Sequence, residues 1–330
     1  RAAGPRAMAA PLRVLCLHGR LQTGALFQER LSKLRRSAAG LDCVFVDGPI
    51  EVTGEQGDSL RGWKQEASPE WDVVESTLRR AWMELGPFDG VLGFSEGAQV
   101  AHFFCQLHCA PAGAAPPLFG LRFAIFAGGI PREGGVGGGR DPGPLPLPSL
   151  HFASASDAVV PIAKSRKLAG AFAGARVVEH KDGHAFPQRR EQLDAVAEFL
   201  RALSPPPPVI QAPAGSLPFE EEQCEELEAL QAMLCEEGEL VRLGEGWPLR
   251  LRVRFAEDAF LDLLLPPGYP QQCRCVAALH THRLDVQAHE AELWERLEAA
   301  HEEAPGAPAV FSLATAAREW AEAVLAAPPE

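Results

Sequence analysis

A serine lies between two glycines in Gly93-Phe94-Ser95-Glu96-Gly97, after an apolar run and before a segment with helical spacing. In this context Ser95 is expected on a sharp turn between a strand and a helix, where glycines let the backbone pass closely. A hydroxyl held there points away from a sheet, and the following helix N-terminus presents N–H groups to an oxyanion. The pattern predicts acyl transfer through Ser95, with a purely structural turn as the alternative.

Two further groups follow strand-like runs later in the chain. Asp157 comes after the run 149–153, and His184 lies in a loop after the run 176–179. The chain order serine, acid, histidine is typical of α/β-hydrolases and differs from the orders of the chymotrypsin and subtilisin classes. We predict that Ser95 attacks an acyl carbon, that His184 transfers its proton, and that Asp157 orients the imidazole.

The acid and the base each have rivals nearby. Asp182 could replace Asp157 as the acid, with Asp141 a more distant candidate, and Asp157 would then only cap a helix. His180 competes with His184 as the base. We prefer His184 because it lies beyond the predicted strand and follows a glycine in a loop, whereas His180 lies within the strand.

Residues around the predicted nucleophile supply an oxyanion hole and a pocket. The backbone N–H of Glu96 is one expected oxyanion donor, and that of Arg20 or Leu21, in the loop after the run 12–17, is the other. Trp63 and Phe94 are the candidate walls of a substrate pocket. Core packing is the alternative role for Trp63.

Alternating strands and helices must position these groups. Strands are expected at 12–17, 41–46, 88–94, 121–126, 149–153 and 176–179, and helices at 25–36, 71–85, 98–108, 162–172 and 192–203, with a polar loop between 47 and 71. Such alternation predicts a mostly parallel sheet flanked by helices. In that architecture, functional groups gather at the carboxyl ends of the strands, where the three candidate side chains are placed.

A proline run divides the chain. The segment 204–216, with four consecutive prolines, predicts a stiff extended linker between a domain at 11–203 and another at 217–330. The second domain is expected to have helices at 220–237, 287–302 and 315–326 and strands at 249–255, 260–265 and 275–279. That pattern is typical of an α+β fold.

Composition limits the possible partners. The 330 residues carry a formal charge of −13, which argues against nucleic acid as a partner. The eight cysteines lack zinc-type spacing and suit reduced thiols, so we expect no metal, no cofactor and a cytoplasmic location. The glycine-rich stretch 134–139 is not followed by Gly-Lys-Ser/Thr, which argues against a nucleotide site. No apolar run is long enough to cross a bilayer.

Several motifs in one order resemble the FSH-type serine hydrolases of the ovarian-cancer-associated type, a group within the α/β-hydrolases. The resemblance covers residues 11–203 and rests on Leu17-His18-Gly19, Arg61-Gly62-Trp63, Gly86-Pro87-Phe88-Asp89-Gly90, Gly93-Phe94-Ser95-Glu96-Gly97-Ala98, Ser156-Asp157, Val160-Pro161 and Gly183-His184. It implies an esterase or thioesterase acting through Ser95, Asp157 and His184 on a small ester or thioester. Members often have Gln where this chain has Glu96, and a carboxylate there could slow the reaction or alter substrate choice.

The second domain resembles an RWD domain. The resemblance rests on Glu226-Leu227-Glu228-Ala229-Leu230 and on Leu265-Pro266-Pro267-Gly268-Tyr269-Pro270. It implies a module that binds a protein partner. The family usually has a further proline where this chain has Arg274. An alternative function for the whole chain is therefore a catalytically idle hydrolase fold that acts as a scaffold through its RWD module.

Overall fold

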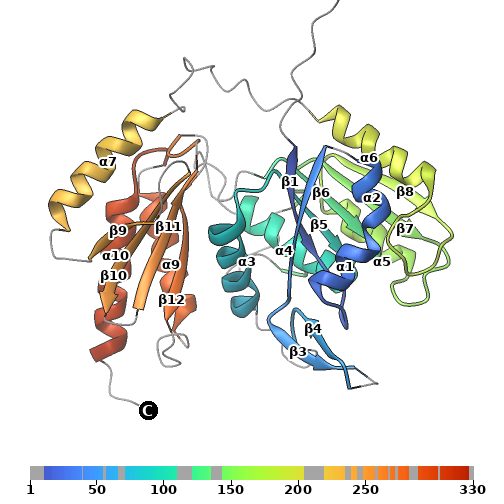
Figure 1. The fold of residues 1–330 in the computed structure, drawn as a ribbon, viewed down its shortest axis with the longest axis horizontal. Helices are drawn as coiled ribbons and strands as arrows, with labels where there is room; N and C mark the ends of the chain where they lie inside the picture. The colour runs from blue at the N-terminus through green and yellow to red at the C-terminus, as the bar shows by residue number, and fades with distance from the viewer. Residues whose placement is uncertain are drawn as a thin grey trace, which may run out of the picture.

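The structure is a computed structural model with a six-stranded and a four-stranded β-sheet that lie side by side, and a two-stranded hairpin (Figure 1). It describes residues 11–326, apart from 39, 55–56, 66–70, 110–120, 135–142, 204–218, 235–238, 244–247, 257–258, 267, 272–273, 282–288 and 304. The predicted linker and the rival acid Asp141 lie outside the described residues.

The first sheet has six strands in the order β2-β1-β5-β6-β7-β8, and every neighbouring pair is parallel. Its strands are β1 (Leu12–Leu17), β2 (Leu41–Val46), β5 (Gly90–Phe94), β6 (Phe123–Ala127), β7 (Ser149–Ser154) and β8 (Ala175–His180). The helices between them are α1 (Gly24–Arg30), α2 (Ser32–Ser37), α3 (Trp71–Leu85), α4 (Glu96–Cys109), α5 (Ile162–Gly170) and α6 (Arg190–Ala202). The predicted α/β class with flanking helices is confirmed.

Alternation along the strands builds one core on each face of this sheet. In β1, Val14 and Cys16 belong to the core formed with α1, α2 and α6, whereas Leu15 and Leu17 belong to the core formed with α3, α4 and α5. Because successive side chains of a strand point to opposite faces, a strand buried on both faces is apolar throughout. This explains the continuous apolar runs in the sequence.

Strand order reverses between β1 and β5. The chain moves outward from β1 to β2 on one side, and from β5 through β6 and β7 to β8 on the other. The loops that leave β1 and β5 therefore diverge at their carboxyl ends, which is where open α/β sheets bind ligands. Ser95 directly follows β5 and lies at this point.

A hairpin lies in the stretch that the sequence predicted as a polar loop. Strands β3 (Ile50–Thr53) and β4 (Ser59–Gly62) pair antiparallel and project from the sheet (Figure 1). Its strands have four residues each and are only partly buried, so their apolar signal is weak. The prediction of a loop here was wrong.

The second sheet is antiparallel, in the order β12-β11-β10-β9. Its strands are β9 (Leu240–Arg242), β10 (Leu249–Ala256), β11 (Ala259–Leu265) and β12 (Val276–Thr281), and its helices are α7 (Glu220–Met233), α9 (Glu290–Glu302) and α10 (Val310–Ala326). The α+β pattern expected from the sequence is confirmed, although α10 begins earlier than the predicted start at residue 315.

Helix α3 lies between the two sheets (Figure 1). On β11 and β12, Leu263 and Ala277 pack toward the helices of their own domain, whereas the neighbouring Leu264, Val276 and Ala278 join the core cluster that contains α3. Helix α3 thus covers this face of the second sheet at β11 and β12, whereas Arg250, Arg252 and Arg254 of β10 are only partly buried.

Candidate active site

Ser95 adopts the strained turn that its sequence context predicts. Its φ is +54°, and its N–H donates a 3.0 Å hydrogen bond to the carbonyl oxygen of Ala127 on β6. A Cβ at Gly97 would collide with the carbonyl oxygens of Leu17 and His18, and one at Gly93 would collide with Gly97. Both glycines are therefore required by close backbone approaches, and the strain is held by the packing around the turn.

His184 and Asp157 meet Ser95 at the carboxyl edge of the sheet. His184 Nε2 lies 2.9 Å from Ser95 Oγ, and His184 Nδ1 lies 2.8 Å from Asp157 Oδ2. Because a carboxylate can only accept, Nδ1 carries the proton and Nε2 is left to accept from the serine hydroxyl. The Asp157 side chain is 2% exposed and the His184 side chain 18% exposed, so the pair is shielded while the imidazole stays accessible.

Asp157 uses its two oxygens differently. Oδ1 accepts 2.8 Å hydrogen bonds from the N–H groups of Val159 and Val160, while Oδ2 faces His184. Helix α5 begins after Pro161 and has no side-chain cap. Asp157 therefore organises its own turn and is not the N-cap of α5.

The rival residues are engaged elsewhere. Asp182 Oδ2 accepts a 2.7 Å hydrogen bond from Gln192 Nε2, and its other oxygen pairs with Arg189. His180 Nδ1 accepts from the Asp182 N–H at 3.3 Å, and burial lowers the pKa of His180. Neither residue is among the hydrogen-bond partners of Ser95 or His184 in the described part of the chain.

The carboxylate of Glu96 holds the neighbouring loops together. Oε2 accepts a 3.0 Å hydrogen bond from the Trp63 N–H, and Oε1 lies 3.3 Å from Arg20 Nη1, which also donates to the carbonyl oxygen of Lys64. From the sequence, Glu96 was expected to donate its backbone N–H, and its carboxylate to slow the reaction or alter substrate choice. Its side chain links the loop of Arg20 and Leu21, both candidate oxyanion donors, to the end of β4.

His18 braces the same region. Its Nδ1 lies 2.8 Å from the carbonyl oxygen of Gly19, and its Nε2 accepts a 3.0 Å hydrogen bond from the Gly48 N–H. One nitrogen must donate and the other accept, which fixes a single neutral tautomer. Burial lowers the pKa of His18 and favours this neutral form.

The two candidate pocket residues occupy different places. Phe94 packs beside the imidazole, with its ring centroid 4.9 Å from that of His184. Trp63 is fully buried in the core, and its Nε1 donates a 2.9 Å hydrogen bond to the carbonyl oxygen of His18. The position of Trp63 therefore corresponds to the core-packing alternative.

No group of three or more metal-ligating side chains occurs among the described residues. Within the same residues, no helix is both long and apolar enough to span a bilayer.

Comparison with protein-family models finds a match for each of the two parts of the chain. Residues 8–196 match the family model described as serine hydrolase (FSH1). The chain belongs to the FSH1 serine hydrolase family. Residues 221–321 match the RWD domain model, so the chain also carries an RWD domain. Both resemblances found in the sequence are confirmed, and so is the prediction that the chain is a serine hydrolase.

Curated relatives of this family match over the first part of the chain. "Esterase OVCA2" of Danio rerio is 32% identical over an alignment of 233 residues, gaps included, that covers 58% of this chain and 98% of the relative. "Esterase OVCA2" of Homo sapiens is 35% identical over 221 residues, covering 58% of this chain and 96% of the relative.

Solved structures also match this part. The crystal structure of Bacillus cereus carboxylesterase has a TM-score of 0.42 at 17% identity and covers 59% of this chain and 89% of that chain. The structure of Zea mays acyl-protein thioesterase 2 has a TM-score of 0.44 at 18% identity and covers 59% of this chain and 95% of that one.

Proposed function

We propose that this chain hydrolyses carboxylic esters or thioesters through an acyl-enzyme formed on Ser95. The observation that carries the proposal is the continuous hydrogen-bonded path from Ser95 Oγ through His184 to Asp157, with distances of 2.9 and 2.8 Å. The esterase names of the relatives support the same class of reaction.

Each residue type has a defined task in this reaction. Ser95 Oγ bonds to the acyl carbon while its proton moves to Nε2 of His184, and Asp157 stabilises the imidazolium that results. The tetrahedral oxyanion accepts hydrogen bonds from the N–H of Glu96 and from that of Arg20 or Leu21.

The intermediate then collapses and the enzyme is regenerated. The bond from the acyl carbon to the leaving oxygen or sulfur breaks as His184 returns the proton to the alcohol or thiol. Water, deprotonated by His184, attacks the ester on Ser95, which releases the carboxylic acid and restores the serine hydroxyl.

A fluorophosphonate probe tests this function on the full chain. We expect labelling of the wild type, loss of labelling in Ser95→Ala, and strongly reduced turnover of alkyl esters in His184→Ala. Ser37→Ala, a substitution at an exposed serine on α2, should label like the wild type. A folded wild-type protein that neither labels nor hydrolyses esters would support the alternative, a catalytically idle scaffold.

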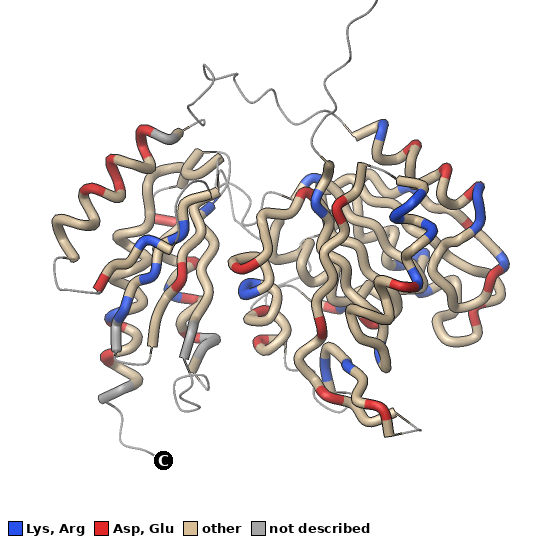
Figure 2. The backbone as a smooth tube through the Cα atoms, viewed as in Figure 1, with Lys and Arg blue, Asp and Glu red and all other residues tan. Residues whose placement is uncertain are grey.

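We assign protein binding to the RWD domain as a second role. Helix α3 covers one face of its sheet at β11 and β12, and we assign the partner to the opposite side, where the helices lie. That side presents Phe311, 46% exposed on α10, and an acidic face of α7 that includes Glu221, Glu225 and Glu228 (Figure 2). Exposed aromatic side chains are typical anchors for partners.

Two matched variants test the binding role. Phe311→Asp adds a charge to the helical side, whereas Val177→Asp changes a valine that is 41% exposed on β8 of the hydrolase. Proteins recovered with the wild type in quantitative affinity purification should be lost with Phe311→Asp and retained with Val177→Asp. Equal recovery with both variants would contradict the assignment.

A further inference from the structure

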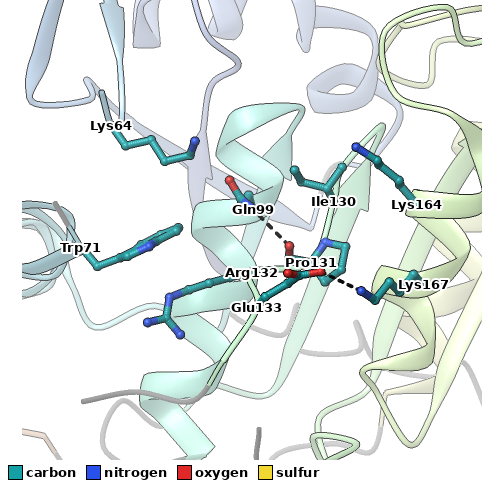
Figure 3. A pocket seen from close by; sticks show the side chains of 9 residues that line it. All are labelled: Lys64, Trp71, Gln99, Ile130, Pro131, Arg132, Glu133, Lys164 and Lys167. Atoms are coloured by element: carbon teal, nitrogen blue, oxygen red, sulfur yellow. Dashed lines mark hydrogen bonds and ion pairs between the residues drawn. The ribbon is translucent and has the colours of Figure 1, made fainter. Parts of the chain in front are cut away.

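A hollow lined by four basic side chains lies at the first turns of α4, the helix that follows Ser95 (Figure 3). Its volume is about 510 Å³, and it lies among the end of β4, the first turns of α4, the segment after β6 and the start of α5. The residues that line it are Lys64, Trp71, Gln99, Ile130, Pro131, Arg132, Glu133, Lys164 and Lys167.

The hollow adjoins the catalytic residues along two stretches of backbone. Gln99 lies in the first turn of α4, with its N–H 3.3 Å from the carbonyl oxygen of Ser95, which directly precedes the helix. Its Nε2 donates a hydrogen bond to the carbonyl oxygen of Pro131. The same segment begins at Gly128, where an added Cβ would lie 3.1 Å from Cε1 of His184. The hollow is therefore one helical turn from Ser95 and two residues along the chain from the contact with His184, within reach of a substrate whose carbonyl carbon is at Ser95.

Two of the four basic side chains are already engaged. Lys167 Nζ lies 2.8 Å from Glu133 Oε1, which neutralises both charges. The guanidinium of Arg132 lies over the rings of Trp71 and Phe103, at 4.9 and 4.8 Å from their centroids. In Figure 3 it extends toward Trp71 and away from the centre of the hollow.

The other two basic side chains, Lys64 and Lys164, face the hollow from opposite sides. Figure 3 shows their ammonium groups extending inward from the end of β4 and from the first turn of α5, on either side of Gln99 and Ile130. Within the described residues, neither ammonium group forms an ion pair. Two positive charges thus line one hollow in a chain whose formal charge is −13, with its acidic residues spread over both domains (Figure 2).

We propose that the substrate carries an anionic group, a carboxylate or a phosphate, that binds between Lys64 and Lys164 while its ester or thioester carbonyl lies at Ser95. This proposal rests on the esterase function proposed above and adds the substrate class. An anion between two ammonium groups gains charge-assisted hydrogen bonds that an uncharged alkyl chain cannot make. A local positive field also speeds the approach of anionic substrates, in a manner that salt weakens.

The test compares esters of equal chain length on the full chain. The three probes are 4-nitrophenyl hexanoate, the 4-nitrophenyl half-ester of adipic acid, and a 4-nitrophenyl hexanoate with a terminal phosphate. We expect kcat/KM to be about tenfold or more higher for at least one anionic ester than for hexanoate, because hydrogen bonds to charged groups have this magnitude. The better of the two identifies the anionic group, and the preference should decrease as salt is added.

Substitutions then assign the preference to the two lysines. Lys64→Met and Lys164→Met should each lower the ratio of anionic to neutral kcat/KM, and Lys164→Glu should lower it further. Lys33→Met, at an exposed lysine on α2, should leave the ratio at the wild-type value.

The outcomes separate this proposal from the function on which it rests. Hydrolysis of hexanoate at the same or a higher kcat/KM than both anionic esters would overturn the anionic substrate class alone. A ratio unaffected by all three lysine substitutions would do the same. If none of the esters is hydrolysed and Ser95 is not labelled by fluorophosphonate, both the esterase function and this proposal are wrong.

Discussion

At the scale of single residues, Glu96 shows how a side chain can prepare a site without reacting. Its carboxylate accepts from the Trp63 N–H and pairs with Arg20, and its own side chain is only 9% exposed. Sequence alone placed Glu96 next to the nucleophile and could not show where the carboxylate points. The structure turns it toward Arg20 and Trp63, where it links two loops.

Glu96→Ala is expected to destabilise the fold and slow the reaction. Loss of the carboxylate leaves the Trp63 N–H and the Arg20 guanidinium without this acceptor, which costs about 1–3 kcal/mol in the free energy of unfolding. It also loosens the loop of Arg20 and Leu21, so kcat should fall more than KM rises. Glu96→Gln keeps an acceptor for the Trp63 N–H, so its stability and activity should lie between those of the wild type and those of Glu96→Ala. Urea denaturation and ester kinetics measure both effects, and full activity in Glu96→Ala would contradict them.

The choice between Asp157 and Asp182 as the acid is a second case in which the structure adds to the sequence. Asp157 and Asp182 both follow predicted strand ends, so spacing left both open, and only the three-dimensional contacts distinguish them. Asp157→Asn can retain the turn bonds to Val159 and Val160, but its amide cannot hold His184 in the same tautomer. Activity should therefore fall by roughly 10³- to 10⁴-fold.

Asp182→Asn is the matched control for that substitution. It removes a charge close to His184 in sequence but disturbs the contacts with Gln192, Arg189 and His180, none of which bonds Ser95 or His184 in the described part of the chain. We expect activity close to that of the wild type. Steady-state ester kinetics of the two variants test this expectation. If Asp182→Asn is inactive and Asp157→Asn is active, the assignment of the acid is reversed.

At the scale of elements, the turn between β5 and α4 depends on backbone proximity. Gly97→Ala places a methyl group against the carbonyl oxygens of Leu17 and His18, so β1 and α4 must separate. Overpacking of this kind costs about 1–3 kcal/mol and should also slow fluorophosphonate labelling of Ser95. Gly170→Ala, at the end of α5 with no atom within 4 Å of the added methyl, should leave labelling unchanged. Equal effects of the two substitutions would contradict this account of the turn.

Helices and strands were predictable from the sequence wherever the apolar residues follow a clear pattern. The runs at 12–17 and 41–46 became strands with the same bounds, because each is mostly apolar and only one residue in each, Arg13 or Asp42, is charged. The β3–β4 hairpin was missed because its strands have only four residues each and are only partly buried, so the apolar pattern in the sequence is weak. The early start of α10 at Val310 was missed because its first turn is stabilised from a distance: the Val310 N–H donates to Glu226 Oε1 on α7.

At the scale of the whole molecule, the RWD domain packs directly against the hydrolase. A buried network crosses the contact: Arg79 on α3 bonds Glu75, lies over the ring of Trp294 at 4.5 Å, and approaches Glu298, which also pairs with Arg274. The proline-rich stretch predicted a stiff spacer between two domains. No local sequence pattern could show that α3 packs against the sheet of the RWD domain as well as against its own sheet. We expect the two domains to unfold as one cooperative unit.

His301 gives this contact a pH dependence. Burial is the main cause that lowers its pKa to about 4; the nearby charge of Glu298 opposes this shift, and those of Arg274 and Arg79 contribute to it. Between the ordinary histidine pKa of about 6.5 and this value, the unfolded chain binds a proton that the folded chain does not, so stability falls as pH falls. The shift corresponds to at most about 3 kcal/mol in the free energy of unfolding.

His301→Gln should therefore flatten the decrease in stability between pH 7 and pH 4, measured by denaturant titration at each pH. His289→Gln, at an exposed histidine on the same domain, should retain the wild-type slope. Since other buried histidines contribute to both variants equally, only the difference in slope between them is diagnostic, and identical slopes would show that His301 does not carry the effect.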